Sequence, residues 1–204
     1  MKNAIQLITA GALSGTMLVG VSGSAAEVNC SALQPNCAKR ILEKMNAKTF
    51  TDSYGTKLNY RIYKSPAYNA TDKNKPAVLF VYLHGAGGSG NDNEQQIKDQ
   101  SALVNYLASD RAENVLSSLP YIVIAPQCPV GFQWVETPYS QGSYSIEEIP
   151  LSKNLNAKYE HIQSIAKHEN ADKGNIMLNG ISMGGYGTWD LALRYPKAFK
   201  AIAP

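Results

Sequence analysis

The sequence predicts an α/β fold in which a mostly parallel sheet has helices on both faces. Two continuous apolar runs, residues 77–83 (AVLFVYL) and 121–125 (YIVIA), have the composition of parallel strands buried on both faces. A third short run, residues 176–178, leads into a helical segment that Tyr195-Pro196 ends. Strands that alternate with helices in this way form parallel sheets with right-handed crossovers.

Residues 1–26 differ from the rest of the chain and predict a signal peptide. Lys2 is their only charged residue, residues 4–21 are rich in Ala, Gly, Leu and Ile, and Ser24-Ala25-Ala26 supplies small residues for cleavage after Ala26. Polar residues and glycines interrupt this stretch, which weakens the alternative of a permanent membrane anchor. We therefore expect a secreted or periplasmic protein without a stable membrane anchor.

The remaining composition is that of one ordinary globular domain. The chain has 204 residues, of which 44% are hydrophobic and 17% charged. Its net charge is only +3, and no Lys/Arg cluster contains interleaved aromatic residues, so nucleic-acid binding is not expected. We divide the chain into the signal peptide, an N-terminal lead at residues 27–47 and a domain at residues 48–204. The oligomeric state cannot be derived from the sequence.

Three cysteines are present, an odd number for an exported protein. Cys30 and Cys37 are close enough in sequence to form a disulfide at the mature N-terminus, which an oxidising compartment would permit. Cys128 is expected to be a buried structural thiol, because no histidine follows it in the context of a catalytic base.

The domain begins with a predicted hairpin, in which residues 48–51 and 58–63 flank Ser53-Tyr54-Gly55. Residues 65–76 are polar, contain two prolines and predict an exposed loop. Farther along, Ser152 is expected to cap a helix that ends near Glu169. The apolar face of that helix contains Leu155, Tyr159, Ile162 and Ala166, whereas His161 and His168 lie off this face and are predicted to be solvated. Asp172-Lys173-Gly174 predicts a turn, and residues 199–204 predict the start of another strand.

A glycine-rich loop, residues 84–90 (HGAGGSG), directly follows the first buried strand. Its four glycines let the backbone approach a ligand and point N–H groups at it, as oxyanion stabilisation requires. The alternatives are a flexible surface loop and a phosphate-binding loop, but the Gly-Lys-Ser/Thr ending of a P-loop is missing. The oxyanion interpretation depends on a serine later in the chain.

Asp92 follows this loop and predicts a helix N-cap. Gln95 stands three residues later, as in a capping box, and the helix is expected to run through Ile97 to Leu107. We prefer this interpretation to metal binding because no histidine or further cluster of carboxylates stands nearby, and we predict no metal site.

Ser182 is the candidate nucleophile. It lies in Gly180-Ile181-Ser182-Met183-Gly184, between the predicted strand and a predicted helix at residues 183–194. Side chains two residues before and after a serine on so sharp a turn would collide with the neighbouring strand and helix, which explains both glycines. The alternative is a Ser/Gly turn without chemistry.

Three separate motifs resemble those of one enzyme group. Residues 83–87 (LHGAG) with 90–94 (GNDNE), residues 125–129 (APQCP) with Trp134, and residues 180–189 (GISMGGYGTW) are similar to the secreted phospholipase/carboxylesterase-like group of the α/β-hydrolase superfamily, also labelled predicted peptidases. That group is related to polyhydroxybutyrate depolymerase-like and feruloyl esterases. The resemblance covers about residues 48–204 and implies the α/β-hydrolase fold.

The resemblance implies a serine carboxylesterase that works through an acyl-enzyme and needs no cofactor. Ser182 would be the nucleophile, and the backbone N–H groups of Ala86 and Met183 would form the oxyanion hole. The expected substrate is a small-molecule or polysaccharide-linked ester. The residues expected to support the loop are His84, Gly85 and Gly87, and aromatic residues that either line a substrate pocket or cover the core are Trp134, Tyr186 and Trp189.

The sequence departs from the family in one respect. The family's triad runs Ser, then Asp or Glu, then His, but after Ser182 the only carboxylate is Asp190 and there is no histidine. We therefore expect a C-terminally truncated chain that lacks the last strands of the fold, with the acid and the histidine beyond Pro204. Two other functions stay open: a serine peptidase of the prolyl-oligopeptidase type, and a non-catalytic binding protein or inactive fragment.

Overall fold

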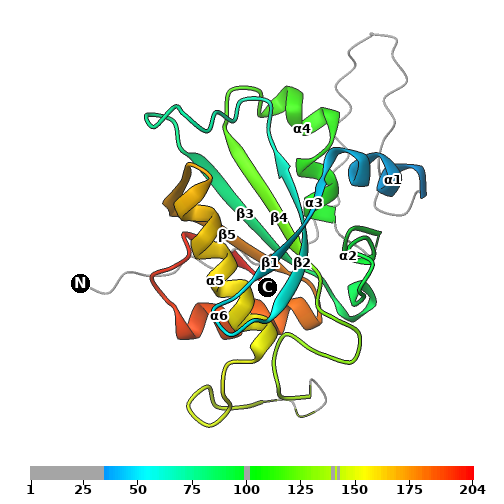
Figure 1. Cartoon of the computed structure of the whole chain (residues 1–204), viewed down its shortest axis with the longest axis vertical. Coiled ribbons are helices and arrows are strands. Elements are labelled where there is room, and N and C mark those ends of the chain that lie inside the picture. The colour runs from blue at the N-terminus through cyan, green and yellow to red at the C-terminus, as the bar shows by residue number, and fades with distance from the viewer. Residues whose placement is uncertain (1–34, 99–101, 139–140, 142) are drawn as a thin grey trace, which may run out of the picture.

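The computed structural model describes residues 35–98, 102–138, 141 and 143–204, and its strands form one sheet in the order β1-β2-β4-β3-β5-β6 (Figure 1). Strand β1 pairs antiparallel with β2, and β2 pairs antiparallel with β4. The other pairs, β4 with β3, β3 with β5 and β5 with β6, are parallel, so the mostly parallel sheet is confirmed. The strands are β1 (Asn46–Thr51), β2 (Lys57–Lys64), β3 (Ala77–Leu83), β4 (Tyr121–Pro126), β5 (Ala171–Gly180) and β6 (Ala201–Ala203).

Helices cover both faces of the sheet, as predicted. Helices α5 and α6 pack on one face, and Figure 1 shows α5 crossing the sheet there. Helices α1, α2 and α3 contribute to a second core on the other face. The helices are α1 (Pro35–Lys44), α2 (Gln95–Lys98), α3 (Ala102–Leu107), α4 (Asp110–Val115), α5 (Lys153–His168) and α6 (Met183–Arg194), with the 3₁₀ turn η1 at Ala86–Gly88.

The two cores follow from the alternation of side chains along the central strands. In β4, Ile122 and Ile124 face the core under α5 and α6, whereas Tyr121 and Val123 face the other core. All residues of β4 are buried, which explains its continuous apolar sequence. This central position places the carboxyl ends of β3, β4 and β5 side by side, at the edge of the sheet where ligands bind in open α/β folds.

A single helix from Asp92 to Leu107 was expected, and within that range the structure describes α2 and α3, with residues 99–101 between them outside the described part. The turn expected before β5 was wrong. Asp172-Lys173-Gly174 belongs to β5 instead of preceding it. Ala77 pairs with Ala171 and Leu79 pairs with Ile176, so the additional residues of β5 form a bulge against β3.

Several expectations fall on residues that the structure does not describe. They are the signal peptide at residues 1–26, Cys30 and the side chain of Cys37. The disulfide and the export signal therefore stay predictions. Among the described residues, no helix has both the length and the apolar character needed to cross a bilayer.

Candidate active site

Ser182 lies at the sharp turn from β5 into α6. The strand ends at Gly180, the helix begins at Met183, and Ser182 has φ 53° and ψ −117°. A positive φ is uncommon for a residue other than glycine and costs free energy, so the surrounding structure must hold it in place. The Ile181 N–H donates to the Leu83 carbonyl at 3.2 Å, and the Gly184 N–H donates to the Ile181 carbonyl at 2.8 Å. These bonds fix the turn while Ser182 stays exposed.

The glycines on either side of Ser182 leave no space for a side chain. A Cβ at Gly180 would overlap the carbonyl group of Gly184, and a Cβ at Gly184 would overlap that of Leu83. The strand, the turn and the helix therefore approach each other at backbone distance. This close approach is the physical reason for the Gly-x-Ser-x-Gly pattern.

The glycine-rich loop after β3 lies directly beside Ser182. A Cβ built at Gly85 would be 3.5 Å from the Ser182 Cβ, and Ala86 and Gly87 are exposed. Within the described residues, the backbone N–H groups of Ala86 and Met183 have no hydrogen-bond acceptor. The site thus combines an exposed hydroxyl with two unpaired backbone donors from the segments that flank it.

His84 is completely buried behind this loop, and both of its ring nitrogens are engaged. Its Nε2 accepts from the Cys128 N–H at 2.8 Å, so Nδ1 carries the proton and donates to the Gly85 carbonyl at 2.5 Å. Burial lowers the pKa of His84 to about 4, against the smaller opposing effect of the bond to Gly85. The ring is therefore neutral at pH 7 and joins the loop to the segment after β4.

A second connection between these segments, Gln127, was not foreseen from the sequence. Its buried amide donates to Asp92 Oδ1 at 2.7 Å and accepts from the Asn93 N–H at 2.6 Å. Gln127 directly follows β4, as His84 directly follows β3. This position at the carboxyl end of a strand could have identified Gln127 from the sequence. His84 and Gln127 together fasten residues 84–93 to residues 127–128.

Asp92 has the predicted cap-like contacts. Its Oδ1 accepts from the backbone N–H groups of Glu94 and Gln95 at 3.0 and 3.1 Å. Burial would raise the pKa of Asp92, but the bonds from Gln127, Glu94 and Gln95 outweigh it and lower the pKa to about 2. The described residues contain no group of three or more His, Cys, Asp or Glu side chains that could hold a metal ion.

The aromatic candidates have different environments. Trp134 is completely buried, and its Nε1–H donates to the His84 carbonyl at 3.0 Å. Of the two interpretations of Trp134, a pocket wall or cover for the core, the structure therefore shows cover for the core. Tyr186 and Trp189, on α6, are 44% and 39% exposed. Cys128 is buried as expected, and burial raises the pKa of its thiol to about 12, so the thiol is un-ionised at neutral pH.

Asp190 is held in an ion pair away from Ser182. Its Oδ1 accepts from Arg194 Nε at 2.7 Å, and its Oδ2 accepts from the Tyr144 hydroxyl at 2.7 Å. The residue is only 1% exposed and stands two helical turns beyond Ser182. The one carboxylate after Ser182 in the sequence is therefore structural.

The prediction that His161 is solvated was wrong. It is 1% exposed, its ring centroid lies 4.0 Å from that of Tyr60, and its Nδ1 lies 3.4 Å from Nζ of the buried Lys158. The β1–β2 hairpin packs over this part of α5 and buries a face that the helical pattern alone marked as polar. His168 is exposed, as predicted.

Comparisons with known proteins identify the fold. No protein-family model matches the sequence, and a comparison with curated proteins gives no match. Among solved structures, the crystal structure of a thermostable esterase aligns with a TM-score of 0.65 and 31% identity, over 79% of this chain and 40% of that one. A ferulic acid esterase aligns with a TM-score of 0.56 and 16% identity, over 78% of this chain and 58% of that one.

Dipeptidyl peptidase 4 from Porphyromonas gingivalis aligns with a TM-score of 0.50 and 17% identity, over 78% of this chain and 20% of that one. The chain spans 40% of the thermostable esterase and 58% of the ferulic acid esterase. The matches together confirm the predicted α/β-hydrolase fold, and the neighbours include esterases.

Proposed function

We propose that the protein is a serine hydrolase that cleaves carboxylic esters through an acyl-enzyme on Ser182. The observation that carries this proposal is the placement of Ser182, exposed at φ 53° between β5 and α6, beside a loop with a free backbone donor. The turn has the geometry of a nucleophile elbow. The 31% identity to a thermostable esterase favours an ester over an amide as the bond that is cleaved.

In this proposal, Ser182 Oγ attacks the ester carbonyl carbon while a histidine takes the hydroxyl proton. The carbonyl oxygen becomes an oxyanion, which the N–H groups of Ala86 and Met183 would bind, and the N-terminus of α6 favours the same negative charge. The alcohol leaves with the proton from the histidine, and water then releases the acid and regenerates the serine. No cofactor takes part.

The histidine of this mechanism is not one of the three in the sequence. His84 has both nitrogens engaged, His161 is buried among Tyr60 and Phe50, and His168 is exposed at the end of α5. We propose that the acid and the histidine follow Pro204 in a longer form of the protein, in the order that the fold uses. The 204-residue chain alone should then be slower by roughly four to six orders of magnitude.

The test is a pair of substrates offered to the protein purified from its native source. We expect turnover of p-nitrophenyl acetate and at least a hundredfold lower rate on a peptide p-nitroanilide, with both rates lost in Ser182→Ala. Preferential cleavage of the anilide would favour a peptidase instead. Absence of both activities in a chain whose intact mass extends past Pro204 would point to a binding protein.

We also propose that the protein is exported, because residues 1–26 have the composition of a signal peptide. Sequencing the N-terminus of the protein from a cell-free culture fluid or periplasmic extract should give a start near Glu27. A protein that keeps Met1 in the cytosolic fraction would contradict export.

A further inference from the structure

A hollow of about 370 Å³ lies between the end of α6 and the middle of α5, far from Ser182. Its floor is Ile176 of β5, and Tyr159 and Tyr195 form a wall. Tyr195 caps the C-terminus of α6, whereas Ser182 stands at the N-terminus, so the two sites are about 20 Å apart along the helix. The volume suffices for a small ring-shaped ligand.

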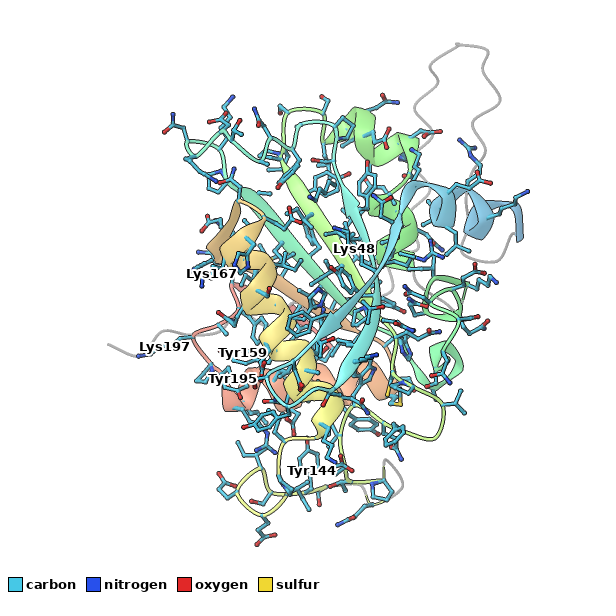
Figure 2. The ribbon with its side chains drawn as sticks, viewed as in Figure 1. Lys48, Tyr144, Tyr159, Lys167, Tyr195 and Lys197 are labelled. Atoms are coloured by element: carbon cyan, nitrogen blue, oxygen red, sulfur yellow. The ribbon has the colours of Figure 1, made fainter. Side chains whose placement is uncertain are left out.

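The wall is a pair of tyrosine rings, one from the middle of α5 and one at the C-terminus of α6. The rings of Tyr159 and Tyr195 are stacked with centroids 3.6 Å apart and planes within 3° of parallel. Figure 2 shows the two side chains next to each other, with Lys197 beside them at the edge of the molecule. Within the described residues neither hydroxyl has a hydrogen-bond partner, so each is available to a ligand. Because the two rings stack on each other, the pair offers a ligand an outer ring face or the ring edges, together with the polar hydroxyl groups.

The rim of the hollow is positively charged. Lys173, from the bulge of β5, and Lys197, after α6, both line it, and neither forms an ion pair with a described residue. Gln163 adds an amide without a hydrogen-bond partner among the described residues, and none of the eight lining residues is acidic. An anionic group at this rim would meet two ammonium groups and no opposing carboxylate.

We propose that this hollow binds a six-membered ring that carries a carboxylate, with the ring against the tyrosine wall and the carboxylate between Lys173 and Lys197. A small inorganic anion would use the lysines but leave the tyrosine wall and the Ile176 floor without contact. The ring can come from an acidic sugar or from an aromatic acid, and the shared chemistry is the carboxylated ring. The site does not depend on the function proposed for Ser182.

The test is calorimetric titration of the purified full chain with four probes at low salt. Sodium glucuronate and sodium benzoate carry the ring and the carboxylate, whereas acetate lacks the ring and glucose lacks the charge. We expect at least one of the first two to bind at least tenfold more tightly than acetate and glucose. Tighter glucuronate binding would identify an acidic sugar, and tighter benzoate binding an aromatic acid.

Substitutions at exposed positions locate the site without endangering the fold. Lys173→Ala combined with Lys197→Ala should weaken binding of the preferred probe at least tenfold, whereas Lys167→Ala, an exposed lysine on α5 outside the hollow, should change it less than twofold. Equal binding of acetate and the ring acids, no binding of any probe at 10 mM, or equal losses in both variants would each overturn the proposal.

Discussion

Gly184 and Gly185 are neighbours at the start of α6, but only the first has no space for a side chain. A Cβ at Gly184 would overlap the Leu83 carbonyl, whereas the nearest atom to a Cβ at Gly185, the carbonyl carbon of Pro204, is 3.5 Å away. Backbone atoms cannot be displaced without moving the strand, the turn and Ser182 with them.

We therefore predict opposite effects for the two alanine substitutions. Gly184→Ala should lower the free energy of unfolding by about 3 kcal/mol or more, because it overpacks the backbone contact. Gly185→Ala should leave stability unchanged or raise it by up to about 1 kcal/mol, because alanine favours helix. Urea unfolding of both variants measures the difference, and equal midpoints would contradict the close approach of α6 to β3.

Gln127 provides a second test at the scale of one residue. Gln127→Leu keeps the volume of the side chain but leaves the Asn93 N–H and the Asp92 carboxylate without this partner. We expect the free energy of unfolding to fall by about 2–4 kcal/mol and amide hydrogen exchange to become faster in residues 86–93.

The control is Ser65→Ala, since Ser65 is also buried and bonded to two backbone groups, but at the opposite end of the sheet. It should lower stability without changing exchange in the glycine-rich loop. Faster loop exchange in both variants would show that Gln127 contributes only general stability.

At the scale of elements, Asp190 and Arg194 connect α6 to the long segment after β4. Arg194 donates to the carbonyls of Ile146 and Ile149 at 3.0 and 2.6 Å as well as to Asp190. Burial and the bond to Asp190 raise the pKa of Tyr144, which keeps its hydroxyl protonated as a donor. One buried ion pair thus anchors the part of this connection that contains Tyr144, Ile146 and Ile149.

Arg194→Ala should therefore lower the free energy of unfolding by about 3–5 kcal/mol, because the buried Asp190 loses its charged partner. It should also expose residues 143–150 to proteolysis. The matched control is Lys98→Ala, which removes an exposed i, i+4 pair with Glu94 and should cost less than about 0.5 kcal/mol. Limited proteolysis with mass analysis of the fragments compares them. An uncut loop in Arg194→Ala would contradict the anchoring role.

The elements that could be predicted from the sequence are those with a strong local pattern. The bounds of β3, α6 and nearly all of β4 followed from continuous apolar runs and from the Tyr195-Pro196 stop. The burial of His161 and the hydrogen bonds of Gln127 could not be predicted, because each depends on a contact with a segment far away in the sequence.

For the candidate site, the residues were predictable and their arrangement only in part. A serine between two glycines, with a glycine-rich loop after an earlier strand, indicates the chemistry by residue type and order. The lack of an acceptor for the Ala86 and Met183 N–H groups needs the three-dimensional structure. Trp134 shows the limit of prediction from the sequence, because an aromatic residue in a loop near the site is equally compatible with a pocket wall and with the core.

At the scale of the whole molecule, buried basic groups make stability depend on pH. Burial lowers the pKa of His84 from 6.5 to about 4, and burial and then Lys158 lower the pKa of His161. Between pH 6.5 and about pH 4 the unfolded chain binds more protons than the folded one. The free energy of unfolding therefore decreases as the pH falls from about 6.5 toward 4. His84 alone accounts for about 3 kcal/mol of this loss.

We predict a clearly lower urea midpoint at pH 5 than at pH 7.5. Asp92 does not contribute to this pH dependence, because its pKa is about 2 in the folded state and 3.8 in the unfolded chain. His161→Leu should reduce the difference between the two pH values, whereas His168→Gln, at an exposed position, should leave it unchanged. Equal midpoints for the unaltered chain would contradict the neutral, buried state of both histidines.

Covalent labelling shows whether Ser182 is the activated nucleophile that we propose. The protein from its native source would be treated with a fluorophosphonate, digested, and analysed by mass spectrometry. We predict one adduct, on the peptide that contains Ser182, and none in Ser182→Ala. An unlabelled Ser182 in protein that hydrolyses esters, or an adduct on another serine, would contradict it.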